Sequence, residues 1–275
     1  MRAQRFPIAY LLFVIVLFPA FSLELSAQSD APSESRSRFE KEKQLPLNVL
    51  KDQVAIWTSP MHMRLKPMLF VGAMGVASAI VAVNDDDITK TLGHDANRER
   101  ISGYVSHAGT LPVNFGVGAG TYAIGKLTKN SYLADTGLLT LEALTDTTII
   151  TGLAKIAADR KRPIDGGDGT FLNGGHSFFS GHSSLSWTTA TVIASRYPHK
   201  PWVKYPAYTL AAAASVSRIT ARKHFASDVL VGSTVGFLIG RYVTRQSGDQ
   251  LFSHVSFTPV SNLRTESFGV RVSFH

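Results

Sequence analysis

Residues 217–228 read Ser-Arg-Ile-Thr-Ala-Arg-Lys-His-Phe-Ala-Ser-Asp, and the rest of the chain is best understood from this stretch. His224 and Asp228 lie four positions apart, so a helix running through both would place them on one face. A carboxylate there can accept a hydrogen bond from the imidazole Nδ1–H, which leaves Nε2 unprotonated, as a nucleophilic histidine requires. Arg218 adds a rigid fork of donors that suits a phosphate-like anion. Taken alone, these residues also fit an ordinary charged turn at a helix surface.

A second basic cluster lies upstream, where Lys155 is followed by Arg162 and Pro163. Because proline interrupts a helix, we expect Lys155 in the last turns of a helix and Arg162 at its mouth. Arg160 and Lys161 lie between them without an evident partner, and we expect both to face solvent. On its own this cluster is a helix stop with basic residues.

A third cluster, Ser180-Gly181-His182, stands ahead of an apolar run that begins near Leu185. The loop before it, residues 166–175, is rich in glycine. A Ser-Gly pair at a helix start leaves backbone N–H groups free to bind an oxyanion, and the helix dipole assists them. Glycine also lets the backbone approach such an anion closely. The plainer interpretation is a helix cap.

The composition bounds the function. The chain has 275 residues, 44% of them hydrophobic and 17% charged, which is enough for one buried core and one domain. It has no cysteine, which excludes thiolate catalysis, disulfides and cysteine-bound zinc. The net charge of +8 suits anionic partners such as phosphate esters or lipid headgroups. No basic stripe is interleaved with aromatic residues, so we expect no nucleic-acid partner.

The N-terminal part has the pattern of an exported protein. Residues 1–27 combine a basic start, an apolar stretch and the small residues Ser26 and Ala27, and we predict a signal peptide. Leu25 is larger than the residue such cleavage sites favour, so an uncleaved membrane anchor remains the alternative. Residues 28–45 are polar and charged, which predicts a disordered linker.

Residues 46–245 predict an all-α helical bundle. The expected helical segments are 45–57, 67–84, 133–157, 188–195, 205–217 and 229–242, and 109–125 is a Gly-rich apolar segment. The mean hydropathy of +0.06 is low for a protein with several membrane spans, and most segments are too short to cross a bilayer. We therefore favour a bundle whose inner helices are apolar most of the way round, with 67–84 as a borderline span.

Two further features complete the prediction for the fold. Asp85, Asp86 and Asp87 are adjacent, and we interpret them as a solvated helix end rather than a metal site, because no spaced ligands lie nearby. Residues 246–275 alternate apolar and polar side chains on either side of a polar turn, which predicts a C-terminal β-hairpin tail.

Together the three clusters resemble the signature of the type-2 phosphatidic acid phosphatase family. They read, in order, Lys155-x6-Arg162-Pro163, Phe179-Ser180-Gly181-His182 and Ser217-Arg218-x5-His224-x3-Asp228. This superfamily also contains the bacterial nonspecific acid phosphatases and the vanadium haloperoxidases, and the resemblance covers residues 155–228. One departure is Phe179, where the family usually has proline, and it concerns the rigidity of the loop more than its donors.

The resemblance implies a role for each residue that matches the family signature. The phosphate would be bound by Lys155, Arg162, Ser180, Gly181 and Arg218. His224 would attack phosphorus to form a phosphohistidine, Asp228 would hold the imidazole, and His182 would protonate the leaving group and then activate water. No metal or cofactor is implied, because the cations neutralise the phosphoryl charge, and vanadate is expected to act as an inhibitor or phosphate mimic.

The resemblance favours an exported phosphatase that hydrolyses phosphate monoesters, either lipid phosphates or small soluble esters. A vanadate-dependent haloperoxidase and a non-catalytic envelope protein with an anion pocket are the alternatives. We expect a periplasmic or membrane-associated location in the cell envelope, with a membrane surface as a candidate partner. Neither the substrate nor the oligomeric state follows from the sequence.

Overall fold

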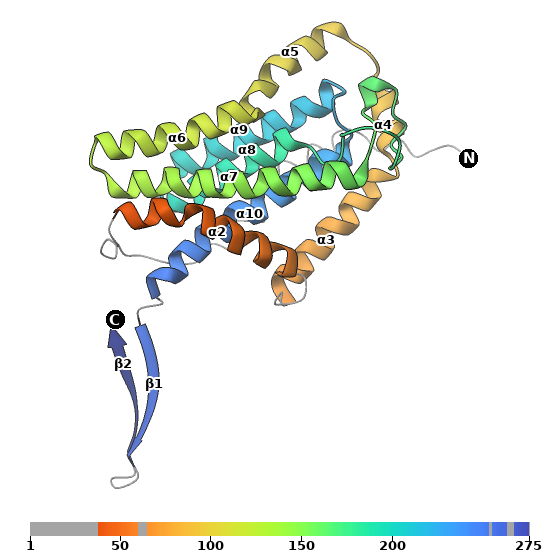
Figure 1. The fold of residues 1–275 in the computed structure, drawn as a ribbon. Helices are drawn as coiled ribbons and strands as arrows, with labels where there is room; N and C mark the ends of the chain where they lie inside the picture. The colour runs from red at the N-terminus through yellow and green to blue at the C-terminus, as the bar shows by residue number, and fades with distance from the viewer. Residues whose placement is uncertain (1–37, 60–64, 253–254, 263–266, 275) are drawn as a thin grey trace.

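The computed structural model describes residues 38–59, 65–252, 255–262 and 267–274 (Figure 1). The α-helices are α2 (Arg38–Thr58), α3 (Leu65–Ala82), α4 (Asp85–Leu92), α5 (Ala96–Ser106), α6 (Leu111–Leu127), α7 (Ser131–Ala158), α8 (Gly181–Arg196), α9 (Pro201–Thr220) and α10 (Ala226–Phe252). Two short 3₁₀ turns are η2 (His107–Gly109) and η3 (Pro163–Asp165). The predicted all-α bundle is confirmed, whereas the predicted signal peptide at 1–27 lies outside the described residues.

Helix α8 is the centre of the bundle, with α7, α9 and α10 packed around it (Figure 1). Its residues are buried almost throughout, and Trp187 is fully buried against α9, where its indole N–H donates to Ser215 Oγ at 3.1 Å. An indole buried with its N–H bonded contributes a large apolar area without leaving a polar group unpaired. The uniformly buried helix explains why its segment shows small apolar and hydroxyl residues rather than one polar face.

Small residues bring α8 and α10 into close contact. Gly232, Gly236 and Gly240 recur every fourth position on α10, so they form one stripe that faces α8. A Cβ placed on Gly236 would lie 2.1 Å from the Ser184 carbonyl oxygen, and one on Gly232 would lie 2.6 Å from that of Ser180. Only glycine permits this backbone approach.

The N-terminal boundary differs from the predicted linker. Helix α2 begins at Arg38, so residues 38–44 are helical rather than disordered. The reason is a tertiary contact that the local composition does not reveal. Glu42 accepts hydrogen bonds from the hydroxyl of Tyr122, at 2.5 Å, and from the ammonium of Lys126, both on α6.

At the C-terminal end, α10 continues to Phe252, beyond the predicted domain boundary at 245. Strands β1 (Val255–Asn262) and β2 (Ser267–Phe274) then pair antiparallel in the predicted tail, with Val255 opposite Phe274. In Figure 1 this hairpin extends from the end of α10, away from the helices.

The described helices were also compared with the dimensions of a bilayer. Among the described residues, none of the helices is by itself both long and apolar enough to cross one. The bent pair Pro67–Ala82 and Asp85–Leu92 reaches that length and composition only when its two helices are taken together, with a bend of 57°.

Candidate active site

The residues of the three sequence clusters meet at one end of the bundle. Lys155 lies in the last turn of α7, Arg218 in the last turn of α9, and Ser180 caps the N-terminus of α8. His224 lies in the turn before α10, and Asp228 lies in the first turn of that helix. Four helix ends therefore supply the site, as the sequence predicted for α7 and α8.

Electrostatics show that these side chains lie close together. Burial above all, together with the positive charges of Arg218, Arg162 and Lys155, lowers the pKa of His182 to about 3. Burial, with Arg162 nearby, also lowers the pKa of Lys155 to about 8 and that of Arg218 to about 10. Three cations that each disfavour another positive charge form a site suited to an anion.

Two of the cations are held by neutral partners and keep their charge available. Lys155 Nζ donates to the backbone oxygen of His176 at 2.6 Å, and Arg218 Nη1 donates to Ser106 Oγ at 3.1 Å. The Nε of Arg218 is buried and finds no hydrogen-bond partner among the described residues. A buried, unpartnered guanidinium N–H is costly unless a ligand accepts from it.

The start of α8 provides the backbone part of the site. Ser180 is the N-cap of the helix, and its hydroxyl accepts from the N–H of Ser183 at 3.5 Å. Gly181 follows as the first helical residue, and a Cβ there would lie 3.4 Å from Thr151 and 3.9 Å from the Lys155 side chain. The first N–H groups of α8 thus point out of the helix beside Lys155, which is the geometry of an anion site at a helix N-terminus.

His224 and Asp228 are brought together as predicted, but by a different local structure. α9 ends at Thr220 and α10 begins at Ala226, so no helix runs through His224. A turn with Arg222 in the left-handed region (φ 55°) connects them, and the backbone N–H of His224 donates to the Arg218 carbonyl at 3.2 Å. His224 Nδ1 lies 3.6 Å from Asp228 Oδ2.

Ser177 contacts both His224 and Asp228. Ser177 Oγ lies 3.4 Å from His224 Nδ1 and donates to Asp228 Oδ2 at 2.5 Å, while the N–H of Phe225 donates to the same oxygen at 3.0 Å. Burial lowers the pKa of His224 to about 4, although Asp228 acts in the opposite direction. His224 is therefore neutral at pH 7, with its Nδ1 facing the carboxylate. Ser177 was missed in the sequence because it precedes the recognised motif.

The prediction for Arg160 is wrong. It was expected to face solvent, but it is completely buried, and its guanidinium donates to Asp228 Oδ1 at 2.5 Å and to Asp85 Oδ2 at 2.8 Å. The interpretation of Asp85 as part of a solvated helix end is wrong for the same reason, because Asp85 is also fully buried. Asp86 and Asp87 are not buried. The pairing could not be read from spacing, because 75 positions separate its partners.

Phe179, which replaces the family's usual proline, has a packing role. Its side chain is 4% exposed and packs with Leu139, Val192 and Ile239 between α7, α8 and α10. The loop before Ser180 is thus anchored by an aromatic side chain in the core.

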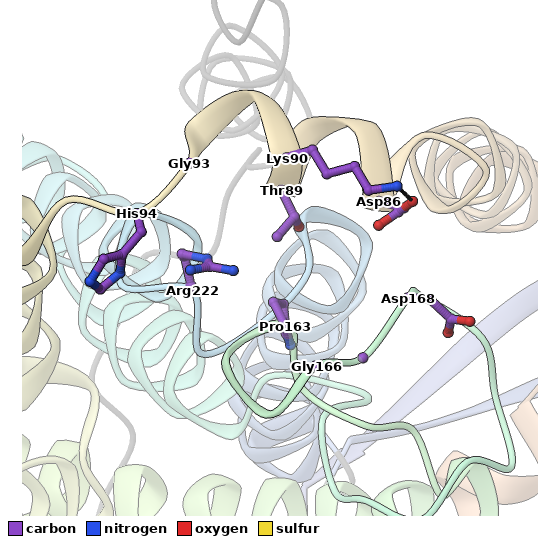
Figure 2. Close-up of a pocket in the computed structure, with 10 residues that line it drawn as sticks. Asp86, Thr89, Lys90, Gly93, His94, Pro163, Gly166, Asp168 and Arg222 are labelled. Carbon is purple, nitrogen blue, oxygen red and sulfur yellow. Dashed lines mark hydrogen bonds and ion pairs between the residues drawn. The ribbon is translucent and has the colours of Figure 1, made fainter.

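A separate cavity of about 480 Å³ lies between α4, the loop that follows Pro163 and the turn at Arg222 (Figure 2). Its lining residues are Asp86, Thr89, Lys90, Gly93, His94, Pro163, Gly166, Gly167, Asp168 and Arg222. Figure 2 shows Lys90 turned toward Asp86, and Arg222 between His94 and Pro163. Pro163 and Arg222 are neighbours in sequence of the candidate site residues Arg162 and His224, but none of the candidate site residues lines this cavity. In the part of the chain that the structure describes, no group of three or more histidine or carboxylate side chains is placed to hold a metal ion.

The fold and the site define a helical protein with a cluster of cations, two histidines and a buried carboxylate at one end of its bundle. Residues 136–251 match the model of the PAP2 superfamily, the family of type-2 phosphatidic acid phosphatases. The family resemblance carried by the three sequence clusters is therefore confirmed for this part of the chain.

Individual relatives match parts of the chain. A lipid A 1-phosphatase from Porphyromonas gingivalis is 39% identical over 87 residues, which are 31% of this chain and 18% of the relative. A PA-phosphatase related-family protein from Dictyostelium discoideum is 28% identical over 141 residues, 44% of this chain and 52% of the relative. The matched region thus spans no more than about half the length of these curated relatives.

A crystal structure of a transmembrane PAP2-type phosphatidylglycerolphosphate phosphatase from Bacillus subtilis was also matched. It is 25% identical in sequence, with a TM-score of 0.48, and the match covers 76% of this chain and 96% of that one.

Proposed function

We propose that this protein is a phosphatase that hydrolyses phosphate monoesters through a phosphohistidine intermediate. The observation that carries the proposal is the convergence of Lys155, Arg162 and Arg218 around His182, together with a neutral His224 whose Nδ1 faces Asp228. Such a site offers positive charge to the phosphoryl group and an unprotonated nitrogen to phosphorus.

Binding would use fixed donors rather than water. Lys155, Arg162 and Arg218 surround the phosphoryl oxygens, and Ser180 and the Gly181 N–H complete the contact. Phosphoryl transfer spreads charge over three equatorial oxygens, and preorganised donors in a buried site stabilise that charge without reorganising. Because these groups supply the neutralising charge, the proposed reaction needs no resident metal or cofactor.

The first chemical step would be an in-line attack on phosphorus. The lone pair of His224 Nε2 forms the P–N bond while the P–O bond to the leaving group breaks. Asp228 accepts a hydrogen bond from the Nδ1–H and stabilises the positive charge that develops on the ring. His182 gives its proton to the departing alkoxide, so the alcohol leaves uncharged.

The second step would return the enzyme to its starting state. The neutral His182 takes a proton from water, the oxygen of that water attacks phosphorus, and the P–N bond breaks to regenerate His224 and release inorganic phosphate. The low pKa of His182 belongs to the site without an anion. A bound phosphate carries negative charge, which raises the pKa of His182 and supports its protonation for the first step.

We propose a lipid phosphate as the preferred substrate class, with small soluble esters as the alternative. The relative named as a lipid A 1-phosphatase supports this choice. Apolar side chains also lie exposed near the site: Leu153 and Ile156 flank Lys155 on α7, and Leu172 lies 78% exposed in the loop that follows. Exposed apolar groups beside a phosphate site suit a substrate with acyl chains.

A membrane-associated place in the cell envelope, reached by export, is part of the proposal. Helix α2 supports membrane contact because several of its large apolar side chains are exposed. Asp52 is 1% exposed, whereas Leu50, Val54 and Trp57 are each more than half exposed. Such a helix is stable where its outer face meets an apolar phase.

The test is a phosphate-release assay on p-nitrophenyl phosphate and on phosphatidate in mixed micelles, with EDTA, vanadate or neither. We expect hydrolysis of both esters, faster with the lipid, that survives EDTA and is inhibited by vanadate. Vanadate-dependent halide oxidation without phosphatase activity would instead identify a haloperoxidase, and silence in both assays would leave a non-catalytic anion-binding protein.

The His224→Ala variant tests the mechanism. We expect turnover to fall by at least about 10³-fold, since the nucleophile is lost. The circular dichroism spectrum should stay unchanged, because the ring forms no part of the apolar core. Trapping of a phosphorylated histidine after acid-free quenching should succeed with the wild type and fail with the variant. A variant that keeps near wild-type turnover would show that another residue attacks.

A further inference from the structure

The buried network behind the nucleophile extends beyond the three motifs. Arg160 and Asp85 touch no part of the phosphate site, yet both are fully buried, and they connect Asp228 to the first turn of α4. Removing such ions from water is costly unless every charge is paired and every donor is used. The buried charges of Arg160 and Asp85 therefore need partners within the protein.

The guanidinium of Arg160 is shared between two carboxylates. Nη1 donates to Asp228 at 2.5 Å and also to Ser227 Oγ at 2.9 Å, and Nη2 donates to Asp85 at 2.8 Å. Nε and Nη2 both donate to the backbone oxygen of Gly169, at 3.0 and 2.6 Å. All three nitrogens of the fork are thus occupied.

Two aromatic rings pack against the guanidinium. The centre of the group lies 4.4 Å from the ring of Phe225 and 4.7 Å from that of Phe171. Asp85 is fixed as well, because its carboxylate accepts from the N–H of Ser227 at 3.0 Å and from the hydroxyl of the same residue. Because the guanidinium of Arg160 is held in place by these contacts, it determines the position of the Asp228 carboxylate that accepts from it.

The charges decide what this arrangement does. With both carboxylates ionised, one guanidinium serves two negative charges, and the three groups together carry one net negative charge. Burial by itself raises the pKa of Asp228, but His224, Arg160 and Ser177 hold the pKa of this carboxyl below its ordinary value. The charge of Asp228 also interacts with that of Lys155.

We propose that Arg160 and Asp85 are a positioning pair that keeps Asp228 ionised and oriented toward His224. The inference rests on the proposed function, in which Asp228 has to accept the hydrogen bond from His224 Nδ1–H. Neither residue touches the substrate, and their effect passes through Asp228.

A charge-balanced pair of variants tests the inference. Arg160→Gln leaves Asp85 and Asp228 facing each other without a cation, so one proton should be shared between them and Asp228 should lose its charge. We expect kcat at pH 6 to fall by about 10²-fold with KM changed less than about threefold, and the acid side of the kcat profile to move upward by about one pH unit or more. The profile moves upward because Asp228 then ionises only at a higher pH.

The double variant Asp85→Asn/Arg160→Gln removes the competing carboxylate as well. Asp228 is then the only acid left among these three positions. We expect the double variant to recover at least about tenfold of the lost kcat and to bring the pH profile of kcat back toward that of the wild type. Asp87→Asn is the matched control: Asp87 lies in the same helical turn but is exposed, so both kcat and the profile should stay unchanged. Arg160→Lys, which keeps the charge, should lie between the wild type and Arg160→Gln.

Two results would overturn the inference. One is a folded Arg160→Gln variant whose profile matches that of the wild type. The other is a double variant that is less active than Arg160→Gln, which a purely structural role predicts because two defects would add. Ring ¹⁵N chemical shifts of His224 provide a readout without catalysis: its Nδ1–H tautomer should be lost in Arg160→Gln and restored in the double variant. If the wild type hydrolysed no ester, the proposed function would fail, while these shifts would still decide whether the pair positions Asp228.

Discussion

Arg218 combines, in one residue, a neutral partner, deep burial and a donor with no partner. Its Nη1 contacts Ser106, and its Nε finds no hydrogen-bond acceptor among the described residues. Holding an unpaired N–H in the protein interior destabilises the fold unless the group serves a ligand. We interpret this unsatisfied donor as the place where a phosphoryl oxygen is bound.

Replacing this arginine tests that interpretation. Arg218→Ala should lower kcat/KM by about 10²–10³-fold, close to 3–4 kcal/mol, because the donor acts on charge that grows in the transition state. Most of the loss should fall on kcat, as measured with a soluble ester at saturating concentrations. Arg218→Lys should recover little, since an ammonium cannot reproduce the planar fork. A loss confined to KM would show that Arg218 contributes to substrate binding alone.

At the scale of the element, the contact between α2 and α7 contains three buried acids. Asp52 on α2 faces Glu142 and Asp146 on α7, and all three are buried. Gln53 donates to Asp146 Oδ1 at 2.7 Å, and Tyr242 of α10 also contacts Asp52. Burial, then the charge of Asp52, raises the pKa of Glu142 to about 8, and burial above all raises that of Asp146 to about 7.

These shifts predict how the stability depends on pH. An acid whose pKa is higher in the folded than in the unfolded protein keeps its proton longer when folded. The folded state therefore loses stability as the pH rises from the ordinary carboxyl value toward 8. The melting temperature should fall between pH 5 and pH 8, and Glu142→Gln should reduce that fall by roughly 3–6 °C. Asp87→Asn, exposed on α4, serves as the control, and an equal fall in Glu142→Gln would show that this contact is not the cause.

At the scale of the whole molecule, the sequence was least informative about contacts between distant segments of the chain. Helix ends were predictable because Pro163 and Ser180 act on their own neighbours in the chain. The Asp85–Arg160 pair was not, because a buried ion pair between distant segments leaves no local pattern. The turn at Arg222 was missed as well, since spacing alone cannot tell a continuous helix from a turn that brings the same side chains together.

The molecule as a whole also presents apolar side chains on the outer faces of α2 and α3, including Leu50, Trp57 and Leu69. We predict that the protein sediments with vesicles of anionic phospholipid and is released by detergent but not by high salt, because apolar contact persists when charges are screened. The double variant Leu50→Ser/Trp57→Ser should shift the protein toward the supernatant. Full release of the wild type by salt alone would show a purely electrostatic attachment.

The glycine stripe of α10 has a consequence for how the site is assembled. The N–H of Ser180 donates to the backbone oxygen of Asp228 at 3.0 Å, and Gly232 lies against the same serine one turn further along. The N-terminal end of α8 and the helix that carries Asp228, α10, are thereby held in close contact. Lys155 and Arg218 come to these two helices from α7 and α9, which both pack on α8, so the positions of all four groups depend on the same helix.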